Sequence, residues 1–211
     1  GSEEAFVQQM NARAKELGMQ DTTFKNCNGL DEEGHLTSAY DVALMSRALL
    51  SHKEILNYTT IWMDTLRGGK TQLVNTNKLL RSYDGITGLK TGTTSQAGSC
   101  ISATAQRGDL SLIAVVLGAS TTQDRFSTAR ALLDYGFDNW SMEPLPQPET
   151  PLTAVKVCGG LQPEVAVSAD LSGSRLVPKE EAGKAGCTVE LQTGVEAPVQ
   201  KGQQLGQVLY T

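Results

Sequence analysis

The stretch ITGLKTGTTSQAGSCISATAQRGDLSLIAVVLGA, residues 86–119, decides the fold of this 211-residue chain. Gly108 and Asp109 stand near its middle and favour a tight turn. Around them, apolar and β-branched residues fill three short runs, as is typical of β-strands: residues 86–92, 99–106 and 111–119. Since the turn joins the second run directly to the third, we predict an antiparallel sheet.

Three helices are predicted, two before these strands in the sequence and one after them. Apolar residues at helical spacing place the first within residues 2–17. The second begins near Ser38, which has Asp41 at the spacing of a capping box. The third begins at about Thr122 and is expected to end at Gly136. Together with the strands, these helices make this part of the chain α/β in character.

The composition changes near Ser141. Proline fixes its own backbone dihedral and donates no hydrogen bond, so four prolines close together predict a stiff linker: Pro144, Pro146, Pro148 and Pro151. Beyond them, short β-branched segments predict a small all-β domain, with strands at residues 153–157, 164–168, 188–191 and 207–210. We therefore expect an α/β (α+β) domain with an antiparallel sheet at residues 1–144 and an all-β domain at residues 145–211.

Charge and hydropathy argue against two classes of partner. The formal net charge is −5, and no run of Lys and Arg occurs. Nucleic-acid phosphates require a basic face, and anionic lipids attract polybasic segments, so neither is an expected partner. No apolar stretch approaches the roughly 18 residues that cross a bilayer.

The cysteines show no CxxC or Cys/His zinc spacing, so no metal is expected. They are Cys27, Cys100, Cys158 and Cys187. Buried free thiols and disulfides both remain open. If one bridge exists, we expect it between Cys158 and Cys187, which fall in the same small domain.

The motif that carries chemistry is Lys90-Thr91-Gly92-Thr93, at the end of the first predicted strand. A lysine there holds positive charge near an anionic substrate, and a threonine hydroxyl can donate a hydrogen bond to a carboxylate. Glycine leaves room for a peptide backbone beside the strand, and the Thr93 amide can point at a developing oxyanion. The alternative for Lys90 is a plain exposed strand lysine.

The order of features resembles that of the low-molecular-mass penicillin-binding proteins, which are serine D-Ala-D-Ala carboxypeptidases. The similarity covers about residues 1–140, and the trailing β domain is similar to the family's usual C-terminal module. The matching segments, in chain order, include Leu17-Gly18-Met19, Gly29-Leu30-Asp31, Thr37-Ser38-Ala39, Asn75-Thr76-Asn77, Asp84-Gly85-Ile86, Gly88-Leu89-Lys90-Thr91-Gly92, Ala97-Gly98 and Tyr135-Gly136-Phe137.

The resemblance implies a role for each site residue. Lys90 would act in catalysis by tuning the electrostatics around a nucleophilic serine, and Lys90, Thr91, Gly92 and Thr93 would bind substrate. Arg125 matches a family arginine by its distance from Gly136; the alternative is a solvated arginine in a first helical turn. The implied partners are a peptidoglycan stem peptide ending in D-Ala-D-Ala, and β-lactams, in the bacterial cell envelope. No cofactor is implied.

Two of the family's three motifs are missing from this sequence. No serine has lysine three positions later, and no Ser-x-Asn or Tyr-x-Asn occurs. We therefore expect a partial penicillin-binding, transpeptidase-like domain that is inactive alone. Such a domain would leave apolar surface uncovered over residues 99–119 and favour self-association. A membrane anchor beyond Thr211 would fit the family.

Two other functions stay open. A serine β-lactamase of related fold is disfavoured by the all-β domain after residue 145. A non-catalytic peptidoglycan-binding or scaffold module would keep the Lys90 strand without a nucleophile.

Overall fold

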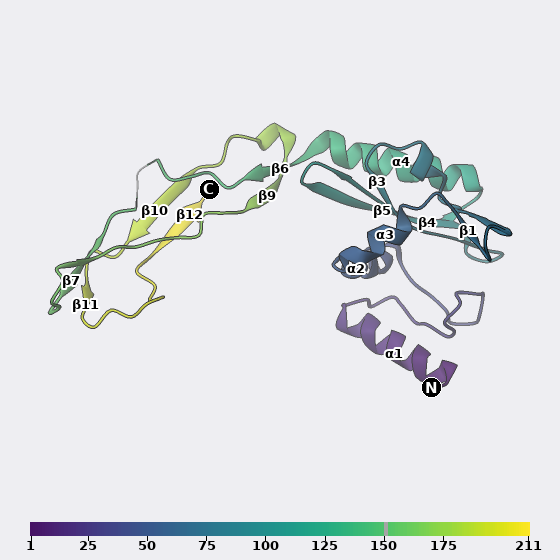
Figure 1. Cartoon of the computed structure of the whole chain (residues 1–211), viewed down its shortest axis with the longest axis horizontal. Coiled ribbons are helices and arrows are strands. Elements are labelled where there is room, and N and C mark those ends of the chain that lie inside the picture. Colours follow the sequence, from purple (N-terminus) through teal and green to yellow (C-terminus); the bar gives the residue numbers. More distant parts are fainter. Residues whose placement is uncertain (150–151) are drawn as a thin grey trace. The chain divides into compact units, whose positions relative to one another are not determined.

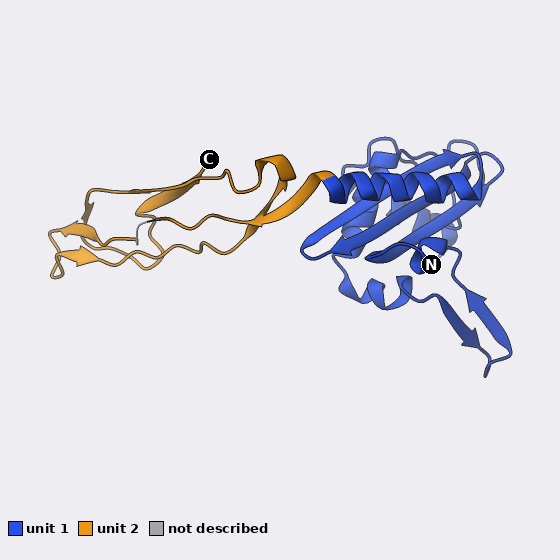
Figure 2. Cartoon of the chain, turned by 90° about the horizontal axis from the view of Figure 1, so that it is seen from above, with its two compact units in different colours: residues 1–138 blue, residues 139–211 orange. Residues whose placement is uncertain are grey.

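The computed structural model describes residues 1–149 and 152–211, and the chain divides into two compact units, residues 1–138 and 139–211 (Figure 2). The predicted domain boundary, between residues 144 and 145, stays a prediction, because a division into compact units does not test which parts fold independently. Pro151 of the predicted linker lies outside the described residues. Leu145 is bonded through its amide to the Gly173 carbonyl, inside the second unit.

The first unit contains four helices, two short 3-10 turns and five strands among the described residues. In chain order they are α1 (Glu3–Glu16), α2 (Ala39–Leu50), η1 (Lys53–Ile55), α3 (Leu56–Thr59), β1 (Met63–Leu66), β2 (Thr71–Val74), η2 (Lys78–Arg81), β3 (Ile86–Thr94), β4 (Gly98–Arg107), β5 (Leu110–Ala119) and α4 (Thr122–Asn139).

The sheet has the order β3-β4-β5 and is antiparallel throughout, as predicted. Lys90 is opposite Ser102, and Gly92 is opposite Cys100. In Figure 1, α4 lies along one face of this sheet and α2 along the other. The hydroxyls of Ser46 on α2 and Ser102 on β4 are 2.8 Å apart, which places Lys90 on the α2 face.

The core lies mainly between β4 and α4. Buried apolar side chains from both elements meet there: Ile101, Ala103, Ala105, Phe126, Ala129, Leu133 and Phe137. Burying each large side chain contributes roughly 1.5–3 kcal/mol. The prediction of uncovered apolar surface is therefore wrong for β4, because α4 covers it. Leu117 on β5 does remain 37% exposed.

Helix α4 continues through Gly136 to Asn139, so the predicted end at Gly136 is wrong. A Cβ on Gly136 would overlap a methyl group of Leu112 on β5. The glycine therefore allows the helix to approach the sheet closely, and its role is packing rather than termination.

The capping-box prediction is half right. Ser38 is the N-cap of α2, and its hydroxyl accepts a 3.2 Å hydrogen bond from the Asp41 amide. The Asp41 carboxylate, only 1% exposed, instead accepts bonds from the Asp21 amide at 2.8 Å and the Thr22 hydroxyl at 2.7 Å. It therefore fixes the loop before the helix.

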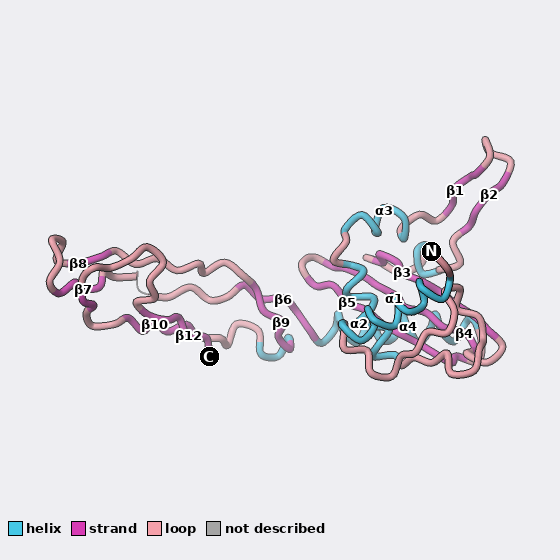
Figure 3. Tube along the Cα trace, turned by 90° about the horizontal axis from the view of Figure 1, so that it is seen from below, coloured by secondary structure: helices cyan, strands magenta, loops and turns pink. Residues whose placement is uncertain are grey.

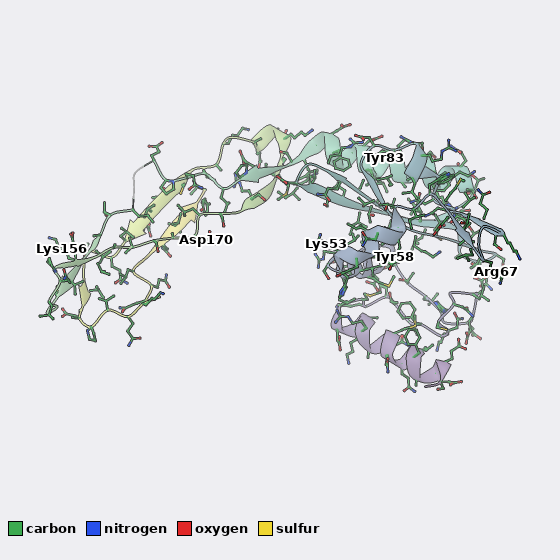
Figure 4. The ribbon with its side chains drawn as sticks, viewed as in Figure 1. Lys53, Tyr58, Arg67, Tyr83, Lys156 and Asp170 are labelled. Atoms are coloured by element: carbon green, nitrogen blue, oxygen red, sulfur yellow. The ribbon has the colours of Figure 1, made fainter. Side chains whose placement is uncertain are left out.

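A two-stranded hairpin of β1 and β2 was missed by the sequence analysis. It extends away from the sheet (Figure 3), and Arg67 stands at its tip (Figure 4). Its apolar side chains are about half exposed, among them Met63, Leu66, Leu73 and Val74. Without a buried face, the alternation that reveals a half-buried strand is absent here.

The second unit is built from short strands, as predicted. They are β6 (Trp140–Pro144), β7 (Val155–Cys158), β8 (Glu164–Val165), β9 (Ser174–Pro178), β10 (Cys187–Leu191), β11 (Val195–Glu196) and β12 (Gly206–Tyr210), with a 3-10 turn, η3 (Lys179–Glu181). The pairs β6–β9, β10–β12 and β7–β8 are antiparallel, and β11–β7 is parallel. Strands β6, β9 and β11 were not predicted.

All four cysteines are free, so the expected Cys158–Cys187 bridge is wrong. The alternative of buried thiols is also wrong for Cys27 and Cys158, which are exposed. Within the described ranges, no helix has both the length and the apolar character needed to cross a bilayer.

Gly85 is expected to be essential for the turn that leads into β3. Its φ is +78°, and a Cβ there would overlap the carbonyl oxygen of Gln106. We predict that Gly85→Ala lowers the free energy of unfolding by about 2–4 kcal/mol, measured by urea denaturation.

Gly108→Ala is the matched control. Gly108 also has positive φ, at 56°, but a Cβ there would meet open space. It should cost only about 1–2 kcal/mol. Equal losses for the two variants would contradict the steric argument.

Asp41→Ala is expected to loosen the loop before α2. Losing the buried acceptor leaves the Asp21 amide and the Thr22 hydroxyl without their partner, so we expect a loss of about 2–4 kcal/mol in the free energy of unfolding. Asp21→Ala, at an exposed position, should change stability by less than about 0.5 kcal/mol. A stable Asp41→Ala protein would show that these bonds are dispensable.

Candidate active-site strand

Strand β3 forms one edge of the sheet among the described strands, since it pairs only with β4. Gly92 is exposed, and a Cβ on it would meet nothing within 4 Å. Space is therefore available beside this part of the strand. An extended peptide could approach an edge of this kind and pair with it.

Lys90 lies exposed on the α2 face of β3. Its ammonium donates a hydrogen bond to the carbonyl oxygen of Thr91. The bond keeps the positive charge close to the strand. The side chain is thus an exposed strand lysine with its charge held beside the edge.

Thr91 points to the opposite face and is 8% exposed. Its hydroxyl is hydrogen-bonded to the hydroxyl of Thr76. The next residue, Asn77, is 2% exposed and donates a 3.0 Å bond from its amide nitrogen to the Gly88 carbonyl. The segment before η2 therefore supports the first half of β3.

Arg125, in the first turn of α4, joins the end of β3 to β4. Its Nη1 donates to the Gly92 carbonyl and the Thr93 hydroxyl, both at 3.0 Å, and to the Cys100 carbonyl at 3.3 Å. The residue is 5% exposed, so the alternative of a solvated arginine is wrong. Burial lowers the pKa of its guanidinium, and its Nε has no partner among the described residues.

Asp31 holds the turn that follows β3. Its carboxylate accepts bonds from the Ser95 hydroxyl at 2.9 Å and the Gln96 amide at 3.3 Å. Hydrogen bonding by the Thr94 side chain is the main cause that lowers the pKa of Asp31, and the bonds from Ser95 and Gln96 add to it. The negative form is therefore the one that the turn favours.

The structure brings all five predicted site residues together, four of them in β3 and the fifth in α4, which packs against the sheet. Lys90, Thr91, Gly92 and Thr93 lie in β3, and Arg125 bonds to two of them. The Lys90 ammonium and the Arg125 guanidinium thus place positive charge on both faces of the sheet beside the end of β3. In the described parts of the chain, no group of His, Cys, Asp and Glu could hold a metal ion.

Thr76, Asn77 and Asp31 were missed as site residues. Asn75-Thr76-Asn77 and Gly29-Leu30-Asp31 carried part of the resemblance, but nothing in their spacing indicated contact with β3. Their partners are 11 to 65 residues away in the sequence, so only the fold reveals these contacts.

The comparisons with known proteins agree across both units. A family model described as D-alanyl-D-alanine carboxypeptidase matches residues 1–121, and one described as penicillin-binding protein 5, C-terminal domain, matches residues 140–211. D-alanyl-D-alanine carboxypeptidase DacF of Bacillus subtilis is 41% identical over 98% of this chain and 54% of its own length. DacC of Escherichia coli is 35% identical over 99% of this chain and 52% of its length.

Solved structures are similar as well. Penicillin-binding protein 5 from Haemophilus influenzae has a TM-score of 0.74 at 28% identity, over 98% of this chain and 60% of that one. Penicillin-binding protein D2 from Listeria monocytogenes, in its cefotaxime-bound form, has a TM-score of 0.59 at 41% identity, over 63% of this chain and 55% of that one.

The chain spans about half the length of the curated relatives it matches. The family match covers more than half of the chain and the relatives cover nearly all of it. The curated relatives are named as D-alanyl-D-alanine carboxypeptidases, and this chain belongs to the D-alanyl-D-alanine carboxypeptidase family.

Proposed function

We propose that β3 is the substrate-binding strand of a serine carboxypeptidase that removes the terminal D-Ala from peptidoglycan stem peptides. The observation that carries this proposal is the open edge at Gly92, with the Lys90 ammonium held beside it. A D-Ala-terminated peptide would lie along the edge and pair with the backbone of β3.

Each site residue has a proposed role. Lys90 stabilises negative charge around the nucleophile, and Thr91 binds the substrate carboxylate. Gly92 keeps the edge open, and the Thr93 amide donates to the oxyanion of the tetrahedral intermediate. Arg125 adds positive charge behind Thr93 and holds β3 in place.

The nucleophile is proposed to come from outside the printed sequence, which contains no Ser-x-x-Lys. That serine attacks the carbonyl of the penultimate D-Ala, and the terminal D-Ala leaves with a proton. Water then hydrolyses the acyl-enzyme. On this proposal the present chain supplies the substrate strand and does not cleave peptides alone.

The proposed partners follow from the same chemistry. A β-lactam carries a carboxylate and a reactive carbonyl like those of the dipeptide, and the Listeria relative is described with cefotaxime bound. With this substrate, the protein would act in the bacterial cell envelope. The partly exposed Leu117 and hairpin residues support the proposal that the chain associates with itself when isolated.

Lys90→Ala should slow acylation. In the complete gene product, we expect the rate of labelling by a fluorescent penicillin to fall about 10²- to 10³-fold, because the positive charge beside the oxyanion is lost. Lys70→Ala, which removes an exposed lysine after the tip of the β1–β2 hairpin, should label at the normal rate.

The 211-residue chain by itself, incubated with the same penicillin, should stay unlabelled. Labelling of the chain itself would place the nucleophile within it. Failure of both the chain and the complete gene product to label would favour the non-catalytic binding or scaffold module.

Arg125→Ala should weaken substrate binding more than turnover. Loss of the guanidinium removes positive charge near the substrate carboxylate, so we expect KM for a D-Ala-D-Ala peptide to rise about tenfold or more, with part of the loss restored by Arg125→Lys. Arg13→Ala, an exposed arginine on α1, is the control. A lower Tm with unchanged KM would show that Arg125 only fixes β3 to β4.

A further inference from the structure

A second cationic region lies in the first unit, away from the Lys90 edge. It is a pocket of about 640 Å³ between η2 and the first half of α4. Lys78, Arg81 and Arg130 contribute their positive side chains to its lining. Of the described residues that line it, none is Asp or Glu. Such a concentration of positive charge is unusual in a chain whose net charge is −5.

The pocket has apolar and aromatic walls. Leu79 and Phe126 are buried side chains in its lining, and Trp62 stands at its side. The Arg81 guanidinium lies 5.5 Å from the centre of the Trp62 ring. Contact with the ring face orients this cation at low cost, as cation–π pairs do.

Arg130 is also held in one orientation. Its Nη2 donates to the Ser82 carbonyl at 2.8 Å and to the Ser82 hydroxyl at 3.1 Å. The guanidinium lies 5.1 Å from the centre of the Tyr83 ring, which Figure 4 labels beside α4. The Asp134 carboxylate accepts a 2.8 Å bond from the Tyr83 hydroxyl and lies 4.0 Å from Nη2 of Arg107.

The pocket is separate from the proposed substrate edge. Its α4 residues pack on the sheet face opposite to α2, whereas Lys90 lies on the α2 face. None of residues 90–93 lines it. Lys90 and the exposed Gly92 therefore stay open when the pocket is filled, while Phe126 of the pocket lies against the Arg125 guanidinium, 4.8 Å from the centre of its ring. The pocket would bind its ligand whether or not β3 binds a peptide.

We propose that this pocket binds a phosphate-bearing ligand. A phosphate offers several strong acceptor oxygens and up to two negative charges, so it can engage three cations together, whereas one carboxylate offers two oxygens and one charge. The hydroxyl of Ser127 and the amide of Gln123 also line the pocket and can donate further bonds. The pocket is larger than one free phosphate ion requires. It therefore has room for a phosphate group together with the part of the ligand to which the phosphate is attached.

The proposal is tested by titrating the whole chain with inorganic phosphate, with a glycerol-phosphate oligomer and with acetate, at low ionic strength. The readout is the NMR signal of the Trp62 indole N–H, assigned with Trp62→Phe; the other tryptophan, Trp140, lies in the second unit and is the internal reference. We expect saturable shifts of the Trp62 signal with the phosphate compounds, and much smaller ones with acetate.

Lys78→Gln and Arg81→Gln should each weaken phosphate binding about threefold to tenfold. Lys70→Gln, with the same change of charge outside the pocket, should leave the affinity unchanged. Arg130→Gln is less informative alone, because Arg130 also supports Ser82.

Tighter binding of the oligomer than of inorganic phosphate would identify a phosphodiester polymer as the source, and equal binding per phosphate would identify the free anion. Either result supports the proposal. It is overturned if acetate shifts the Trp62 signal as strongly, if Lys70→Gln weakens binding as much as Lys78→Gln does, or if no probe shifts the signal.

Discussion

The register between β3 and β4 is the constraint on which the candidate site depends. Side chains alternate along a strand, so a slip by one residue would exchange the two faces of β3. Lys90 would then point toward α4, and Thr91 would leave the hydroxyl of Thr76. In the observed register Thr91 is opposite the buried Ile101 and is itself only 8% exposed, so its burial and its bond to Thr76 resist this slip. The burial of Thr91 therefore decides on which face the ammonium emerges.

Polar contacts hold β3 against this sheet at both ends, where burial alone is weak. Asn77 bonds to the Gly88 carbonyl near its beginning, and Asp31 bonds to the turn after its end. Arg125 connects β3 and β4 from the α4 face, and one of its nitrogens donates to three acceptors. These side chains come from three separate segments, so the strand edge is rigid only when the loop, η2 and α4 are all in place. Preorganisation of this kind is what an oxyanion-binding strand requires.

The sequence predicts the sheet well, because its strands are apolar, β-branched runs and the turns between them carry glycine. It fails where a residue acts through a distant partner. Gly136 is a residue type typical of a helix end. Its close approach to Leu112 depends on how the helix packs on the sheet, which the sequence does not reveal. Asp41 has capping-box spacing, yet its carboxylate accepts hydrogen bonds from two donors in the preceding loop. The β1–β2 hairpin has no buried face and hence no readable period. Arg125 could be found by family resemblance, but its burial could not.

The two cationic regions differ in a way that separates their chemistry. At β3 the positive charge lies beside an exposed glycine backbone, which suits a ligand that pairs along a strand and presents one carboxylate. Beside α4, two of the three cations rest on aromatic rings and no backbone edge is available, which suits a compact, highly charged group instead. The sheet stands between the pocket and the Lys90 ammonium, but Phe126, which lines the pocket, lies against the Arg125 guanidinium, 4.8 Å from the centre of its ring. The two regions therefore adjoin at Phe126 and Arg125, and Arg125 in turn bonds to Gly92 and Thr93.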